Sequence, residues 1–474
     1  MTEEKQYVAP LFQVLQQHQN VTQGNFHVPG HKQGKVFDDK AASFFGDLLP
    51  LDLTEVGELD DLHQPVGAID QAQQLAAEAF DADRTFFLVG GSTSGNLALI
   101  LSCCRPGERL IVHRSSHQSV FHGCILAGAR PVFISGRGEI PQGGRLEAED
   151  LRYALRRYPD VKGVFITSPD YFGRLQPVAE LAEMCHRFGV PLLVDEAHGA
   201  HFGFHPSLPR RSIALGADAA VQSTHKMLPA MTMASMLHLR GNRVDPDRVG
   251  HWLRVVQSSS PSYPLMASLD LARRLMAVQG TSLLEQALER ATLIRQGIST
   301  LTHLREEFIP GNDPLKLNIR ARRKISGYRL QEGLERRGLF MEMADHEKVL
   351  AVLTPGTSPL EGERMVEALA EWDQAVGKME EDEPVPMPSI PPVMESEVSL
   401  DRLRTLPESV VALTDAEGKI ATRMVTPYPP GVPLLLPGER VGRQQLDRIL
   451  HILRHGGRVR GLLAGSPQKM YVIK

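Results

Sequence analysis

Cysteine is scarce in this chain. Four cysteines occur among 474 residues, namely Cys103, Cys104, Cys124 and Cys185. Their number and irregular spacing argue against a disulfide scaffold and against a Cys-x-x-Cys metal site, so we expect buried thiols in a reducing compartment and no bound metal.

The sequence also lacks long hydrophobic runs and an excess of one charge. No stretch approaches the roughly 18 apolar residues that span a membrane, and the start of the chain has no signal-peptide pattern. Basic residues number 52 and acidic residues 56, which gives a net charge of −4. This balance argues against binding nucleic acid through phosphate contacts. We therefore expect a cytoplasmic protein with no membrane or nucleic-acid partner.

Alternating strand and helix patterns fill residues 70–240. Apolar side chains recur every three or four residues over 69–80, which predicts a helix. A second helix is predicted over 96–103. Short apolar runs predict strands at 85–89, 110–112, 131–134, 161–167, 191–195, 219–223 and 233–239. Nearly continuous apolar strands between helices predict an α/β fold with a mostly parallel sheet covered on both faces.

The length corresponds to two or three domains. An acidic, proline-rich stretch at 379–393 cannot hold a regular helix and is interpreted as a connector. The predicted organisation is an N-terminal arm and interface segment (1–69), a large α/β domain (70–290), a small-domain region (291–378), the connector, and a C-terminal domain (394–474). The last of these contains a predicted helix over 442–455.

Two predicted strands end in reactive side chains. The strand at 191–195 runs into Asp-Glu-Ala-His, which begins at Asp195, and the strand at 219–223 is followed by Thr-His-Lys, which ends at Lys226. Ligand groups in α/β sheets gather at the carboxyl ends of strands. Taken singly, such an aspartate can be a turn cap and such a lysine is normally solvated. Together, an amine nucleophile and a carboxylate for a pyridinium nitrogen indicate a pyridoxal phosphate (PLP) site.

A phosphate-bearing cofactor also needs an anion site. Residues 90–96 read Gly-Gly-Ser-Thr-Ser-Gly-Asn between a predicted strand and a helix. Hydroxyls and unpaired backbone N–H groups at a helix start suit an anion, although such a turn alone is often only a helix cap. His117 follows the strand at 110–112, where its imidazole could stack on a pyridine ring or simply be satisfied by turn hydrogen bonds.

These motifs together resemble the Orn/Lys/Arg decarboxylases, which are PLP enzymes of fold type I. The resemblance extends to three further segments, which are His27-Val28-Pro29-Gly30-His31-Lys32, Asp52-Leu53-Thr54-Glu55 and Leu436-Pro437-Gly438-Glu439. It implies a large domain with a mostly parallel sheet and a smaller α+β C-terminal region. Only 26 residues precede His27, so the chain resembles short, arginine-decarboxylase-like members without the N-terminal wing.

The resemblance also implies residue roles. Lys226 would bind PLP covalently, and Asp195 would pair with the pyridine nitrogen. His117 and Ala197 would pack on opposite faces of the ring, with His198 near the phenolic oxygen. The phosphate would be held by Ser92, Thr93, Ser94, Ser223 and His225. Catalysis would fall to Lys226, Asp195, His117 and His198.

The implied reaction is the α-decarboxylation of a basic L-amino acid. The first expectation is L-arginine to agmatine and CO2 in polyamine biosynthesis, with lysine or ornithine as alternatives. A cationic side chain needs a carboxylate partner, and Glu58, Asp60 and Glu439 are candidates, although most such acids are merely solvated. The resemblance further implies a homodimer or a dimer-based oligomer such as a tetramer, with the active site at the dimer interface. From other classes, an aminotransferase, a carbon–sulfur lyase or a non-catalytic PLP-binding protein stays open.

Overall fold

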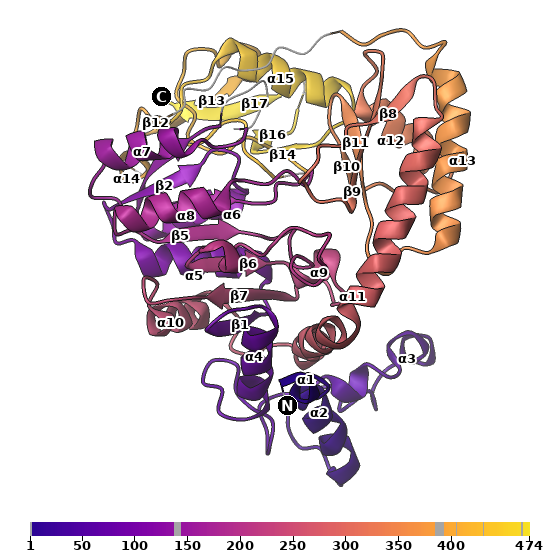
Figure 1. Cartoon of the computed structure of the whole chain (residues 1–474). Coiled ribbons are helices and arrows are strands. Elements are labelled where there is room, and N and C mark those ends of the chain that lie inside the picture. The colour runs from indigo at the N-terminus through magenta and orange to yellow at the C-terminus, as the bar shows by residue number, and fades with distance from the viewer. Residues whose placement is uncertain (1, 137–143, 384–392, 404, 430, 466–467) are drawn as a thin grey trace. The chain divides into compact units, whose positions relative to one another are not determined.

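The computed structural model describes residues 2–136, 144–383, 393–403, 405–429, 431–465 and 468–474 (Figure 1). Helices and strands alternate through the first half of the chain, so the predicted α/β class is confirmed. The chain divides into two compact units. Unit 1 contains residues 1–103 and 193–283, and unit 2 contains residues 104–192 and 284–474. The last boundary falls within the long helix α11 (Tyr263–Ser299).

Unit 1 is built around the strand order β1-β7-β6-β5. These strands are β1 (Arg84–Leu88), β7 (Ser235–Leu239), β6 (Ala219–Gln222) and β5 (Leu192–Asp195). β7 runs antiparallel to both of its neighbours, while β5 and β6 are parallel. The carboxyl ends of β1, β5 and β6 therefore share one edge of the sheet.

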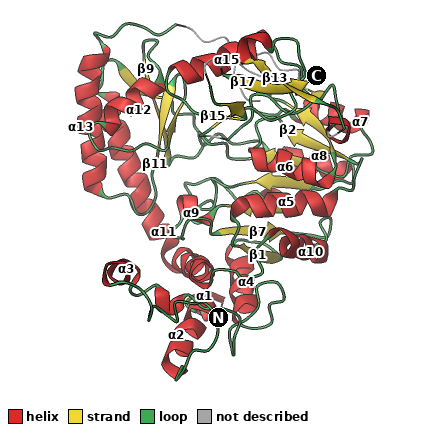
Figure 2. Ribbon diagram, turned by 180° about the vertical axis from the view of Figure 1, so that it is seen from behind, coloured by secondary structure: helices red, strands yellow, loops and turns green. Residues whose placement is uncertain are grey.

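Helices of unit 1 pack against this sheet, and further helices form the N-terminal segment of the chain. Figure 2 shows α5 and α10 side by side. The helices are α1 (Thr2–Gln6), α2 (Pro10–Val21), α3 (Asp39–Phe45), α4 (Ala68–Ala79), α5 (Gly91–Cys103), α9 (Thr224–Met227) and α10 (Pro246–Val256), with 3-10 turns η1 (Leu49–Leu51) and η2 (Ile213–Leu215).

Helix α5 packs closely on the strands because of a glycine. A Cβ atom on Gly95 would lie 2.8 Å from Leu88 Cδ1 and 2.9 Å from Val221 Cγ1, closer than carbon atoms pack. The small residue lets the start of α5 approach the ends of β1 and β6. The N-terminus of the helix is thereby brought to the edge where these strands end.

Unit 2 has the strand order β4-β2-β3-β12. Here β4 (Val164–Thr167), β2 (Arg109–His113) and β3 (Arg130–Ile134) are parallel, and β12 (Val393–Glu395) is antiparallel to β3. The associated helices are α6 (Gln118–Ala127), α7 (Ala148–Arg157) and α8 (Val178–Arg187). A second, antiparallel sheet has the order β10-β11-β9-β8. It consists of β8 (Leu304–Glu306), β9 (Lys316–Ala321), β10 (Met343–Ala344) and β11 (Lys348–Val352), accompanied by α12 (Gly327–Glu335) and α13 (Pro359–Val376).

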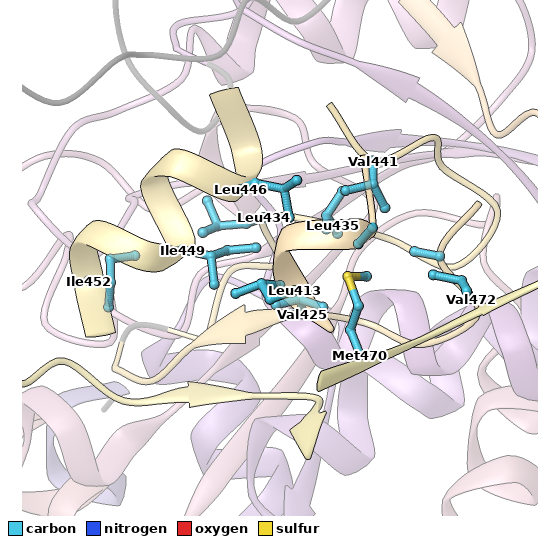
Figure 3. Close-up of a cluster of buried hydrophobic side chains, with 12 residues drawn as sticks. Leu413, Val425, Leu434, Leu435, Val441, Leu446, Ile449, Ile452, Met470 and Val472 are labelled. Carbon is cyan, nitrogen blue, oxygen red and sulfur yellow. The ribbon is translucent and has the colours of Figure 1, made fainter. Parts of the chain in front are cut away.

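The C-terminal part of unit 2 has its own hydrophobic cluster, which Figure 3 shows. Ile449 and Leu446 of helix α15 point into it, together with Met470 and Val472 of strand β17. The surrounding elements are α14 (Leu400–Leu403), η3 (Leu413–Asp415), α15 (Arg443–Arg454), β13 (Glu408–Ala412), β14 (Thr426–Pro427), β15 (Val459–Arg460), β16 (Leu462–Leu463) and β17 (Lys469–Ile473).

The predicted elements are confirmed to within a few residues, with one informative difference. Helix α5 begins at Gly91, whereas the apolar pattern indicated a start at Asn96. The first turn of α5 carries glycine and hydroxyl side chains, so hydrophobic periodicity could not detect it. The predicted domain boundaries stay predictions, and residues 384–392 of the predicted connector lie outside the described residues.

Among the residues that the structure describes, no helix combines the length and the hydrophobicity that crossing a membrane requires. Within the same residues, no three His, Cys, Asp or Glu side chains gather as metal ligands would.

The close packing of the cluster in Figure 3 predicts that a larger truncation of a buried side chain lowers the stability more than a smaller one. Ile449 is fully buried, so Ile449→Ala should lower the free energy of unfolding by about 2–5 kcal/mol and Ile449→Val by about 1 kcal/mol. Urea unfolding of both variants measures the two losses. Equal effects of the two substitutions would contradict close packing at this position.

Candidate active site

Asp195 ends strand β5 as a buried carboxylate with 3% of its surface exposed. The Asn96 side-chain amide donates to Oδ2 at 2.9 Å, and the Ala197 backbone N–H donates to Oδ1 at 3.1 Å. Burial raises the pKa of Asp195, and this outweighs the positive charge of Lys226 and the two hydrogen bonds, which favour the ionised form. At Asp195, burial therefore favours the neutral acid, while the positive charge of Lys226 favours the ionised carboxylate.

Lys226 lies in α9, the single helical turn that follows β6. Its Nζ atom is 3.0 Å from Nε2 of His198, which is 4% exposed. Because β5 and β6 are parallel neighbours, Asp195 and Lys226 are carried to the same edge of the sheet. The structure thus brings together the predicted amine nucleophile, the predicted carboxylate and His198.

The predicted phosphate turn is the first turn of α5. Ser92 Oγ lies 2.7 Å from Ser223 Oγ, which joins the helix start to the end of β6. Ser94 Oγ donates to the Gly91 carbonyl at 2.8 Å. Backbone N–H groups in the first turn of a helix have no partner within the helix and favour anions. Thr93, in the same turn, is exposed.

His225 is held through its own backbone and ring. Its N–H and its Nδ1 both donate to the Ala234 carbonyl, at 3.2 and 3.0 Å. This double contact fixes the residue that precedes Lys226. The role of His225 in holding a phosphate stays a prediction.

Gln257, which the sequence did not indicate, holds the backbone that leads into the phosphate turn. Its Oε1 accepts hydrogen bonds from the backbone N–H of Val89 at 2.7 Å and of Gly90 at 3.3 Å. Gln257 directly follows α10 and is far from the turn in sequence, so no local pattern could have indicated it. Asn96 was part of the quoted Gly/Ser-rich motif, but its bond to Asp195 was not predicted.

His117 belongs to unit 2, where it caps the N-terminus of α6. The Ser119 backbone N–H donates to His117 Nδ1 at 3.3 Å, and the Gln118 N–H donates to the Gly431 carbonyl at 2.9 Å. Gly431 has a φ of +92°, and a Cβ atom there would lie 2.9 Å from His117 Nε2. Glycine therefore lets the C-terminal segment lie against this imidazole. Stacking of His117 on a cofactor ring stays a prediction.

The three acidic candidates have different surroundings. Asp60 is 7% exposed, and its two carboxylate oxygens accept five backbone N–H groups at 2.8–3.3 Å around the start of α4. Glu439 is 5% exposed, and its Oε2 accepts from Arg114 at 3.1 Å and from the Leu436 N–H at 2.8 Å. Glu58 is exposed. Asp60 caps a helix, and Glu439 pairs with a buried guanidinium.

The residues of unit 1 fit the chemistry of PLP. An amine beside an imidazole, a buried carboxylate and a hydroxyl-rich helix start all lie where strands β1, β5 and β6 end. These groups match the aldehyde, the pyridine nitrogen and the phosphate of the cofactor, respectively.

Comparison with known proteins leads to the same class of enzyme. Residues 9–312 match the Orn/Lys/Arg decarboxylase major domain, and residues 387–459 match the C-terminal domain of the same family. The chain is 40% identical over 478 residues to the uncharacterized protein YaaO of Bacillus subtilis, with 98% of each chain covered. It is 34% identical to an arginine decarboxylase of the same organism, with 99% of this chain and 98% of the relative covered.

A solved structure shows the same fold. The Francisella novicida lysine decarboxylase LdcF has a TM-score of 0.83 at 18% identity, with 99% of this chain and 82% of the other covered. The chain belongs to the Orn/Lys/Arg decarboxylase family. It is a PLP-dependent amino-acid decarboxylase of fold type I, as the motifs predicted. Membership of this family argues against the aminotransferase, carbon–sulfur lyase and non-catalytic alternatives.

The cap formed by Asp60 generates a stability prediction. In Asp60→Asn, the amide NH2 must face backbone donors, so the free energy of unfolding should fall by about 1–2 kcal/mol. Thermal unfolding without substrate measures this loss. Glu58→Gln is the matched control, because an exposed side chain should change stability by less than about 0.5 kcal/mol. An unchanged melting temperature in Asp60→Asn would contradict the capping role.

Proposed function

We propose that this enzyme decarboxylates L-arginine to agmatine and CO2. The observation that carries the proposal is the 34% identity to an arginine decarboxylase over almost the full length of both chains. The proximity of Lys226, Asp195 and His198 supports it. The product is a polyamine precursor, so we also propose a role in polyamine biosynthesis. A cytoplasmic location is part of the proposal and is supported by four free cysteines.

In the proposed reaction, each residue of the site has one task. PLP, when bound, supplies an electron-withdrawing ring that accepts charge from the substrate's α-carbon. Lys226 would hold the cofactor through its Nζ atom, and His198 lies within hydrogen-bond distance to exchange a proton with Nζ. Asp195 keeps a proton on the pyridine nitrogen, since its buried carboxylate is stabilised by a cationic partner. Ser92 and Ser223 bind phosphate oxygens at the start of α5.

Recognition of the substrate side chain requires a carboxylate. Asp60 is engaged by backbone N–H groups and Glu439 by Arg114, so each already serves a partner within the chain. Glu58 is the exposed member of the three and is the carboxylate that we propose for the guanidinium.

The reaction can be tested directly on the purified protein with PLP. L-Arginine should yield equal amounts of CO2 and agmatine, and Lys226→Ala should lose both this turnover and the visible absorbance of the lysine-bound cofactor. Lys162→Ala is the matched control, because Lys162 is a partly exposed lysine outside the site. Formation of cadaverine from lysine, or of putrescine from ornithine, would instead identify lysine or ornithine as the substrate. Turnover in Lys226→Ala would contradict the role of Lys226.

We also propose that the enzyme is a homodimer. The chain carries exposed apolar side chains within residues 21–48, including Phe26 at 98% and Phe44 at 87% exposure, and no described residue of α3 is buried. Exposed aromatic side chains in one short segment are typical of a surface that a partner covers. A second copy of the chain is the partner that we propose.

Light scattering during gel filtration tests the dimer. The double variant Phe26→Ser with Phe44→Ser should shift the mass toward that of the monomer, because it removes apolar contact area from the proposed interface. Phe340→Ser is the control, since Phe340 is 81% exposed in a different part of the chain. A wild-type monomer, or an unchanged dimer in the double variant, would contradict this interface.

A further inference from the structure

A row of buried polar side chains crosses the four strands of unit 1 next to the active site. Glu196 directly follows β5, Gln222 ends β6, His238 lies in β7 and Thr85 lies in β1. Each of the four is at most 2% exposed. Buried polar groups are costly unless they are fully hydrogen-bonded, so this row needs an explanation.

Hydrogen bonds join these side chains, and each one is donated toward Glu196. Ser212 donates to Glu196 Oε1 from its backbone N–H at 2.8 Å and from its hydroxyl at 2.6 Å. The Gln222 amide NH2 donates to Glu196 Oε2 at 2.8 Å. The Glu196 carboxylate therefore accepts three hydrogen bonds. Burial raises the pKa of Glu196 to about 7, while these hydrogen bonds and the charge of Arg211 favour its ionised form.

The remaining orientations follow from this carboxylate. Because the NH2 group of Gln222 faces Glu196, its oxygen faces His238 Nε2 at 3.2 Å and must accept. His238 Nδ1 then accepts from the Thr85 hydroxyl at 2.8 Å. Burial lowers the pKa of His238 to about 3, so the ring is neutral, with one donor and one acceptor as this arrangement requires. Each hydrogen bond of the row thus joins a donor to an acceptor.

The row adjoins the residues that hold the cofactor. Glu196 follows Asp195, and Gln222 precedes Ser223. The last paired residues of the two strands are Asp195 and Val221, and the Glu196 N–H donates to the Val221 carbonyl at 2.9 Å. The bond between Glu196 and Gln222 therefore ties β5 to β6 where their backbone ladder ends.

We propose that Glu196 is a positioning residue that fixes the separation between Asp195 and the Ser223–Lys226 turn through its hydrogen bond to Gln222, and thereby tightens the binding of PLP. This inference rests on the PLP site described above. It assigns Glu196 no contact with substrate or cofactor.

The donor and acceptor pattern allows a sharp test. In Glu196→Gln, the new amide must turn its oxygen toward Ser212, so its NH2 meets the NH2 of Gln222 unless Gln222 and His238 both reverse their donor and acceptor groups. In either case the charged acceptor between the two strands is lost. In the exchanged pair, Glu196→Gln with Gln222→Glu, the new glutamine accepts from Ser212 and donates to the new glutamate, which also accepts from His238. The single variant removes the carboxylate from the row, and the exchange restores a carboxylate on the neighbouring strand.

The measurement is the dissociation constant for PLP, titrated by visible absorbance, with circular dichroism and thermal unfolding of the cofactor-free protein as folding controls. Glu196→Gln should bind PLP about tenfold more weakly, the effect of losing one hydrogen bond to a charged group. The exchanged pair should return to within about threefold of wild type. Glu183→Gln, an exposed glutamate on α8, is the matched control and should bind PLP as the wild type does.

Two results would overturn the proposal: wild-type PLP affinity in Glu196→Gln, or a folded exchanged pair that binds as weakly as the single variant. If the exchanged pair does not fold, Ser212→Ala replaces it. Weaker PLP binding at an unchanged melting temperature then supports the proposal, and unchanged affinity overturns it. The measured quantity here is PLP affinity and not turnover. A wild-type protein that binds PLP but releases no CO2 would therefore contradict the proposed function and leave the proposal for Glu196 standing.

Discussion

The burial of the Asp195 carboxylate at the end of β5 is the constraint on which the rest of the site depends. Removing an ionised carboxylate from water costs several kcal/mol unless other charges and hydrogen bonds compensate. Asn96 and Ala197 donate to it and Lys226 supplies a positive charge, yet the pKa of Asp195 is still raised. Compensation within the chain is therefore incomplete, and a protonated pyridine nitrogen is a partner that can complete it.

The same constraint accounts for the close packing of α5. Asn96 can reach Asp195 only because the first turns of α5 lie close to the strand ends, and the missing side chain of Gly95 permits that approach. The approach also brings Ser92 to Ser223. One small residue thus serves both the carboxylate that we predict to pair with the pyridine nitrogen and the hydroxyls that we predict to bind the phosphate.

The sequence predicted the parts of the site that are local in the chain. Asp195 and Lys226 follow apolar strands, and that pattern alone located them at a sheet edge. The start of α5 was placed too late because its first turn has no apolar residue. Gln257 and the bond between Arg114 and Glu439 were missed because each joins segments far apart in sequence. Glu439 was considered for its charge alone, and only the folded structure shows the guanidinium that pairs with it.

The adjacent acids Asp195 and Glu196 show how one strand end serves two purposes. Successive residues of a strand point to opposite faces, so two neighbouring carboxylates can be buried without sharing an environment. Glu196 receives three hydrogen bonds from Ser212 and Gln222 and the charge of Arg211, although burial still raises its pKa to about 7. Asp195 receives two hydrogen bonds, and the cation beside it is Lys226, the lysine predicted to bind PLP. This difference makes Asp195 the residue suited to an external cationic ligand. Glu196 is instead suited to holding the strand that presents it.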